Sequence, residues 1–162
     1  MNYFELFGFP VMPKVDKALL AKKYFELQKM NHPDFFTQAT EDEQETALQQ
    51  SAAINKAFNI FQNEEKTIEY FLKEKGIIET DEKYQLPSGF LMEMMELNET
   101  LMEKDGVEVA GELAAIEKAV YEEVKPLLDQ PSTEYNAGDM EKLKAYYYKK
   151  KYLKRILERL GD

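Results

Sequence analysis

The chain has 162 residues, of which 44% are hydrophobic and 12% aromatic, and its formal net charge is −10 at pH 7. This length and apolar content suit one domain with a good core or two small domains, and they exclude an intrinsically disordered chain. The acidic balance disfavours general nucleic-acid binding, the lack of cysteine excludes disulfides and thiolate metal sites, and a single histidine excludes a multi-histidine metal centre.

The composition favours helices, since leucine, glutamate, lysine, methionine and alanine dominate and there are only 7 glycines and 6 prolines. No stretch approaches the roughly 20 apolar residues that span a bilayer. Residues 1–10 lack the basic and apolar regions of a signal peptide and the arginines of a transit peptide. We therefore expect an all-α, soluble, cytoplasmic protein without a membrane partner.

Two helices are predicted at the beginning of the chain. A short helix or a turn is expected over residues 2–7, because Gly8 and Pro10 end it. Asp16 is a suitable N-cap for a second helix, over residues 17–30.

The helix over residues 17–30 has an apolar face and a basic face. Its expected buried stripe consists of three side chains at i, i+4 and i+7: Leu20, Tyr24 and Leu27. Lys22 and Lys29 lie almost opposite this stripe, and Lys23 lies on its flank. The lysines are therefore expected at the surface.

The tripeptide His32-Pro33-Asp34 follows this helix and contains the only histidine. Proline fixes its own φ and moves the residue before it away from helical geometry, so the helix ends here and the three side chains are presented on a turn. A proline stop and a turn aspartate are common at helix ends, which leaves a purely structural role open. Acid–base catalysis by His32 is a third possibility, although no nucleophile or oxyanion element is visible.

Thr40-Glu41-Asp42-Glu43 has the form of a capping box and predicts a helix that runs to about Gln62. The side chains expected along one side of it are Leu48, Ala52, Asn55 and Phe58, with Ile54 and Phe61 nearby. This helix and the one over 17–30 are expected to form an antiparallel pair with the tripeptide turn at one end. A short helix over 65–75 then ends at Gly76.

A boundary between two domains is expected where polar residues precede Leu86-Pro87-Ser88-Gly89. The expected division is a first domain at 1–76, a linker at 77–89 and a second domain at 90–162. Three helices are predicted in the second domain: residues 90–104, 108–128 and 139–160, with Pro126 kinking or ending the second one early. Their short connections indicate an antiparallel three-helix bundle.

The helix over residues 90–104 has two apolar arcs. The first is a core stripe: Phe90, Met94, Leu97 and Leu101. The second mixes apolar and acidic side chains: Leu91, Met92, Met95, Glu96, Glu99, Met102 and Glu103. A bundle buries one stripe per helix, so the second arc is expected to stay partly exposed as an adaptable protein-binding surface. Packing of this arc against the first domain is the alternative.

Residues 146–152 interleave tyrosines and lysines, a pattern that alone could bind single-stranded nucleic acid. However, several side chains share one helical face and are expected in the core: Tyr146, Leu153, Ile156, Leu157 and Leu160. We expect the lysines opposite them to form a solvated or interdomain face, and we expect no nucleic-acid partner.

Three motifs resemble a J domain: Asn2-Tyr3-Phe4-Glu5-Leu6-Phe7-Gly8, Leu27-Gln28-Lys29-Met30-Asn31-His32-Pro33-Asp34 and Ile54-Asn55-Lys56-Ala57-Phe58. The opening motif, the length and the separate acidic helical part are similar to the HscB type, the J-protein co-chaperones of iron–sulfur cluster assembly. This resemblance covers essentially the whole chain. It implies an N-terminal J domain packed on a C-terminal three-helix bundle, and a regulator without enzymatic chemistry, cofactor or metal.

The resemblance also implies a first partner, a DnaK-class chaperone of the HscA type, whose ATP hydrolysis the tripeptide would stimulate. The implied chaperone-binding residues are His32, Pro33, Asp34, Lys22, Lys23 and Lys29. The lysines would steer the protein toward an acidic surface. One departure from the family pattern is Phe35, at a position that is often basic in J domains.

A second implied partner is an iron–sulfur scaffold protein of the IscU type. The implied scaffold-binding residues are Leu91, Met92, Met95, Glu96, Glu99, Glu103 and Tyr152. The function expected on this basis is to deliver the scaffold to the chaperone. The alternatives are a general J protein with other clients, a small enzyme that uses His32, and an RNA-binding helical protein.

Overall fold

The computed structural model describes residues 1–101 and 103–160, and every regular element in this part of the chain is a helix. The all-α prediction is therefore confirmed. The chain divides into two compact units, of which the first contains Met1–Glu74 with Pro131–Thr133 and the second contains Lys75–Gln130 and the chain from Glu134 on. Met102 and the last two residues of the expected second domain lie outside the described residues.

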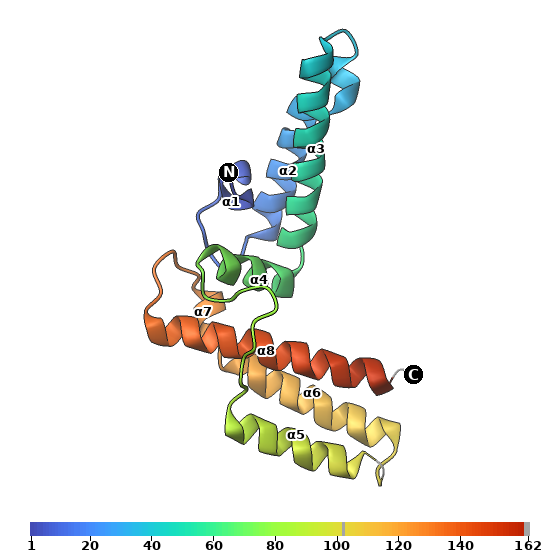
Figure 1. Ribbon diagram of the computed structural model, residues 1–162, viewed down its shortest axis with the longest axis vertical. Coiled ribbons are helices and arrows are strands. Elements are labelled where there is room, and N and C mark those ends of the chain that lie inside the picture. The colour runs from blue at the N-terminus through green and yellow to red at the C-terminus, as the bar shows by residue number, and fades with distance from the viewer. Residues whose placement is uncertain (102, 161–162) are drawn as a thin grey trace. The chain divides into compact units, whose positions relative to one another are not determined.

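The first unit is a helical hairpin with short flanking helices, as predicted. Its elements are α1 (Tyr3–Phe7), α2 (Lys17–Asn31), the 3-10 turn η1 (Pro33–Phe36), α3 (Glu41–Phe61) and α4 (Glu64–Glu74). Figure 1 shows α2 and α3 side by side as an antiparallel pair, with η1 and its loop at one end and α1 and α4 near the other. The tripeptide turn therefore lies at the tip of the hairpin.

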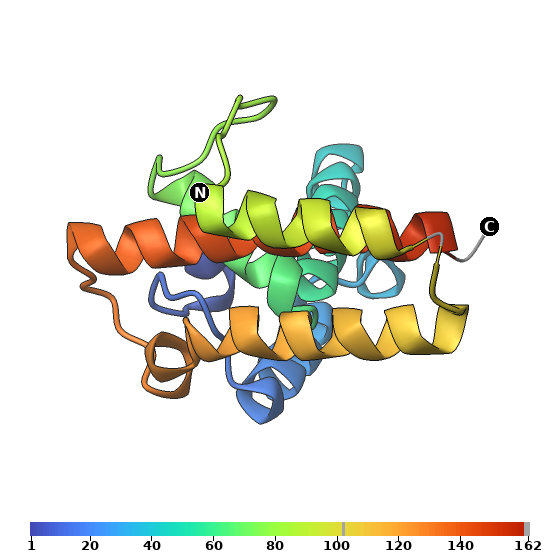
Figure 2. The ribbon, with the colours of Figure 1, turned by 90° about the horizontal axis from the view of Figure 1, so that it is seen from below.

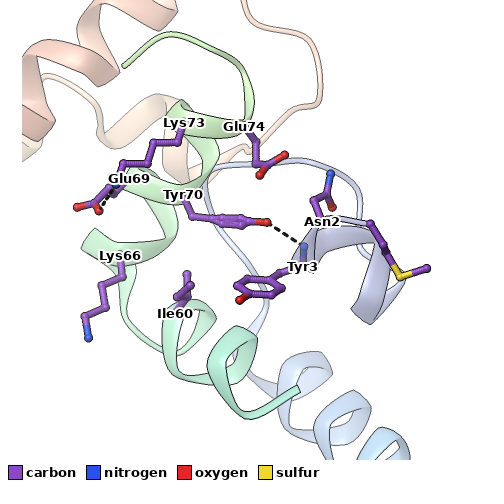
Figure 3. Close-up of a pocket in the computed structure, with 9 residues that line it drawn as sticks. Asn2, Tyr3, Ile60, Lys66, Glu69, Tyr70, Lys73 and Glu74 are labelled. Carbon is purple, nitrogen blue, oxygen red and sulfur yellow. Dashed lines mark hydrogen bonds and ion pairs between the residues drawn. The ribbon is translucent and has the colours of Figure 1, made fainter. Parts of the chain in front are cut away.

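Aromatic packing at the base of the hairpin holds α1, which is too short to be stable alone. The buried rings of Phe4 and Phe7 lie 5.0 and 5.6 Å from the ring of Phe61 in α3. The Tyr70 hydroxyl of α4 accepts the Tyr3 N–H at 2.9 Å, as Figure 3 shows. Burial of this hydroxyl raises the pKa of Tyr70 to about 12. These contacts fix the chain's start against α3 and α4.

The side of α3 that carries Leu48, Ala52 and Asn55 is not the side that it buries, whereas Ile54 and Phe61, expected nearby, are buried. Leu48 is 59% exposed, and Ala52 and Asn55 are exposed as well. The residues that α3 buries are Ala47, Ser51, Ile54, Ala57 and Phe61. Small side chains fill most of these positions because they let the backbones of two helices approach closely, and hydrophobicity alone does not reveal such positions.

Only one of the three side chains expected in the stripe of α2 is fully buried. Leu20 is 2% exposed, whereas Tyr24 and Leu27 are half-buried. The Tyr24 ring stacks on Phe58 of α3, with the ring centroids 4.1 Å apart. The apolar core between α2 and α3 is therefore small, and half-buried contacts such as the stack of Tyr24 on Phe58 add to it.

The second unit is a three-helix bundle. Its helices are α5 (Ser88–Thr100), α6 (Gly106–Glu122), the short α7 (Lys125–Asp129) and α8 (Ala137–Leu160). In Figure 2, α5 and α6 run alongside α8. The prediction for Pro126 is confirmed, because α6 ends before it and the proline occupies the first turn of α7. None of the helices in the described part of the chain is long and apolar enough to cross a membrane.

Lys149 of α8 links all three long helices of the bundle. Its Nζ lies 2.9 Å from Glu123 Oε2 at the end of α6 and 5.5 Å from the centre of the Phe90 ring in α5, and the residue is 8% exposed. The expectation that the lysines of residues 146–152 form a solvated or interdomain face is therefore wrong for Lys149. The methylene stem packs in the core while the ammonium group reaches an acid and an aromatic face. Conversely, Leu157, expected in the core, is 39% exposed.

The segment between α4 and α5 is tied to α8. Tyr84 stacks on Tyr148 with the ring centroids 4.3 Å apart, and Lys144 Nζ lies 2.7 Å from Glu82 Oε2. The hydrogen bond from Lys144 holds the pKa of the Glu82 carboxyl below its usual value. Contacts with α8 therefore hold this segment in place, although its sequence suggested a linker.

Lys149→Ala is expected to lower the free energy of unfolding of the bundle by about 2 kcal/mol, because it removes buried methylene groups and leaves Glu123 without its cation. Lys149→Met keeps most of the packing, so we expect it to lose less. Lys154→Ala, at an exposed position of the same helix, serves as the matched control. Chemical denaturation followed by circular dichroism measures the difference, and equal stability of all three variants would contradict this role.

Candidate functional site

The conformation of His32 is fixed at the point where α2 stops. Its N–H still donates to the carbonyl oxygen of Gln28 at 2.8 Å, but its own φ and ψ are −64° and 132°, which is extended. Pro33 follows as the first residue of η1. The proline ring thus ends α2 and turns the chain within one residue.

The His32 ring closes this turn through its own backbone. Its Nδ1 accepts the Asp34 N–H at 3.2 Å, so the neutral ring carries its proton on Nε2. The side chains of His32 and Asp34 are 47% and 86% exposed. Asp34 Oδ2 lies 3.5 Å from His32 Nδ1, so the turn presents an N–H donor and an exposed carboxylate side by side, and this open arrangement favours a binding contact over acid–base catalysis.

Gln44 near the start of α3 fastens the loop beyond η1. Its Nε2 lies 3.0 Å from the carbonyl oxygen of Phe36 and 3.3 Å from those of Thr37 and Ala39. The Ala39 N–H in turn donates to Phe36 O at 3.0 Å. One side chain of α3 therefore holds the backbone that follows the tripeptide.

A polar cluster joins α2 to α3 below the tip. Asn55 Oδ1 accepts from the Tyr24 hydroxyl at 2.7 Å and from Gln28 Nε2 at 2.8 Å, and the Ser51 hydroxyl donates to Gln28 Oε1 at 3.0 Å. Sequence reasoning missed this cluster. Its only sequence signal is the presence of amides beside both apolar stripes, since the register between the two helices decides which of them meet.

The lysines assigned to chaperone binding differ in their surroundings. Lys22 and Lys29 are exposed on the outer side of α2, and neither forms an ion pair with a described residue. Lys23 is half-buried and lies 3.9 Å from Glu26. Lys22 and Lys29 are therefore free cations on the helix that leads to His32, whereas Lys23 is partly neutralised.

The acidic methionine face of α5 is the second candidate surface. Met92 and Met95 are 63% and 62% exposed, and Glu96 and Glu99 are exposed beside them, while Phe90, Met94 and Leu97 are buried. The division of α5 into a core stripe and an exposed arc is thus as expected for these residues, whereas Leu101, expected in the stripe, is half-buried and follows the end of α5. Such a mixture of flexible apolar and charged side chains suits protein recognition.

The residues at the edges of this surface differ in their exposure. Leu91 is half-buried, Glu103 is exposed beyond the end of α5, and Met102 lies outside the described residues. Tyr152 of α8 is half-buried and its ring lies edge-on to Phe90, with the centroids 6.0 Å apart. The structure therefore places Tyr152 beside α5 and anchors it there.

Comparisons with known proteins agree with both parts of the chain. Residues 86–161 match the family model of the HSCB C-terminal oligomerisation domain. The "Co-chaperone protein HscB homolog" of Vibrio vulnificus strain YJ016 is 38% identical over 138 residues, which are 84% of this chain and 81% of the relative. The protein of the same name from Shewanella halifaxensis is 38% identical over 137 residues, 79% of each chain.

Two solved structures are similar over nearly the whole chain. The crystal structure of human co-chaperone protein HscB has a TM-score of 0.77 and 29% identity, and the match covers 99% of this chain and 81% of the human one. Chaperone HscB from Vibrio cholerae has a TM-score of 0.60 and 30% identity, and the match covers 99% of both chains.

Gln44→Ala is expected to loosen the loop without unfolding the hairpin, because the replaced amide donates to three loop carbonyls. We expect hydrogen exchange at the Ala39 N–H to become about tenfold faster, which corresponds to about 1.4 kcal/mol of local stability. Gln50→Ala, exposed on the same helix, should leave this rate unchanged. Unaltered exchange in Gln44→Ala would show that Gln44 does not hold the loop.

Proposed function

The chain belongs to the HscB family of J-protein co-chaperones, and we propose that it connects a DnaK-class chaperone of the HscA type with an iron–sulfur scaffold protein of the IscU type in the cytoplasm. In this proposal it stimulates the chaperone's ATPase and delivers the scaffold, assisting the maturation of iron–sulfur proteins. It acts as a regulator and performs no chemistry itself.

The observation that carries the proposal is the fixed presentation of His32-Pro33-Asp34 at the tip of a hairpin in a chain of this family. The His32 Nδ1 accepts a hydrogen bond from the Asp34 N–H, which fixes the ring. The ring therefore offers its Nε2–H in one direction, beside the exposed Asp34 carboxylate. A rigid contact of this kind can favour one state of a bistable ATPase, since its own ordering adds little entropic cost.

Charge supports the orientation of this contact. Lys22 and Lys29 lie on the face leading to the tip without an ion pair to any described residue, and Lys23 contributes from its flank. Although the chain as a whole has a net charge of −10, such a basic face attracts an acidic partner. The chaperone is therefore expected to dock along α2, from the lysines toward His32.

The scaffold is proposed to bind the exposed arc of α5 together with Tyr152. Met92 and Met95 offer adaptable apolar contacts, while Glu96, Glu99 and Glu103 favour a basic partner. Because both surfaces belong to one chain, binding of the scaffold raises its effective concentration beside the bound chaperone. Two contacts of modest strength can then act as one strong joint contact.

Nucleic acid is a weaker candidate partner than the sequence pattern suggested. Lys149 is buried against Glu123, and Lys150 lies 3.9 Å from Glu117 Oε1 in α6. Two lysines of this run are therefore paired with glutamates of the bundle, which leaves less positive charge to bind phosphates.

Asp34→Asn and His32→Gln are each expected to reduce stimulation of the chaperone's ATPase by at least about tenfold, because they remove the carboxylate and the imidazole contact of the tip. Single-turnover ATP hydrolysis with purified chaperone measures this effect. Scaffold binding, measured with the same proteins, should remain unchanged. Loss of both activities would contradict two separate surfaces.

Combined replacement of Met92 and Glu96 by alanine is expected to weaken scaffold binding by roughly tenfold to a hundredfold, since it removes an apolar and a charged contact from the centre of the surface. Isothermal titration calorimetry with the purified scaffold is the measurement. Val107→Ala with Glu122→Ala, two exposed positions of α6, is the matched control. An unchanged affinity would indicate a different client, as for a general J protein.

A further inference from the structure

A phenylalanine stands at the surface of α2 among the lysines assigned to the chaperone. Phe25 is 70% exposed, and its ring makes no ring contact with a described residue. It lies three residues after Lys22 and four before Lys29, so the three side chains share one face of the helix. The outer face of α2 is therefore both basic and apolar.

Packing within the hairpin does not account for this ring. The side of α2 that faces α3 carries Leu20, which is buried, Tyr24, which stacks on Phe58, and Gln28, which bonds Asn55. At about 100° per residue, Phe25 lies well away from that side. Aromatic residues are also poorer helix formers than lysine or glutamine, so local stability does not favour phenylalanine here.

We propose that Phe25 is an apolar anchor of the chaperone contact and enters an apolar hollow within an acidic surface of the ATPase. This inference rests on the proposed function and names a further contact residue of the same site. Phe25 precedes His32 by two helical turns, or about 10 Å along the axis, so one partner surface can touch both. Burial of a phenylalanine side chain also supplies affinity that charges at an exposed contact do not.

The chemistry of the tip supports an apolar contribution. Phe35 occupies the position after the tripeptide, is 66% exposed, and lies edge-on to the His32 ring with the centroids 6.2 Å apart. This tip therefore lacks a cation at its end and offers a second exposed ring. The basic part of this surface is small, since its cations are Lys22 and Lys29 with a partly neutralised Lys23.

Salt separates the two contributions. Attraction between exposed charges is screened over about 8 Å at physiological ionic strength, whereas apolar burial is not. The affinity lost with Phe25 should therefore be independent of salt, and the affinity lost with the lysines should decrease as salt is added.

The experiment measures the affinity of the full chain for the ATP-bound, purified HscA-type chaperone at about 0.05 and about 0.3 M salt. Phe25→Ala is expected to weaken binding about tenfold at both concentrations, and Phe25→Leu to restore part of it. The double variant Lys22→Ala with Lys29→Ala should approach the wild type at the higher concentration. Leu48→Ala, which truncates a similarly exposed side chain on α3, should change nothing.

His32→Gln, tested in parallel for ATPase stimulation, distinguishes a failure of the Phe25 anchor from a failure of the proposed function. If Phe25→Ala binds like the wild type while His32→Gln no longer stimulates, the anchor is overturned and the proposed function stands. If His32→Gln stimulates normally, the proposed function itself is overturned. The anchor is also overturned if the affinity that Phe25→Ala loses is regained at the higher salt concentration. It is likewise overturned if Phe25→Ala changes self-association of the chain and leaves chaperone affinity unchanged.

Discussion

The proline ring at residue 33 decides where the first unit turns, and the geometry of the tip depends on it. Because the ring excludes helical geometry from His32, α2 stops at Asn31 and the chain can return as α3. The extended His32 also brings its Nδ1 to the Asp34 N–H. A single covalent constraint thus ends a helix, starts the return and orients a side chain for a partner.

This constraint is useful only because the rest of the hairpin is rigid behind it. The interior between α2 and α3 is narrow, since Ala47, Ser51 and Ala57 fill much of the buried side of α3. Hydrogen bonds through Gln28 and Asn55 therefore take over part of the connection between the helices. Fully satisfied polar clusters fix one register between helices, whereas apolar packing alone tolerates several.

The bundle solves a related problem with a buried cation. Lys149 reaches Glu123 and the Phe90 ring, so it joins the helices at the same place where Tyr152 packs beside α5. With one face of α5 secured in this way, its other face can keep methionines and glutamates in solvent. In both units, specific internal contacts thus leave one helix face free for a partner, the outer side of α2 and the exposed arc of α5.

The helices, the turn at Pro33, the break near Pro126 and the two faces of α5 could be predicted from the amino-acid sequence, because they follow from local sterics and from periodicity along one chain segment. The buried face of α3, the partners of the Lys149 ammonium and the contact between Gln28 and Asn55 could not be predicted in this way. These features depend on the distance and register between helices that are far apart in sequence, and no pattern within one helix encodes them.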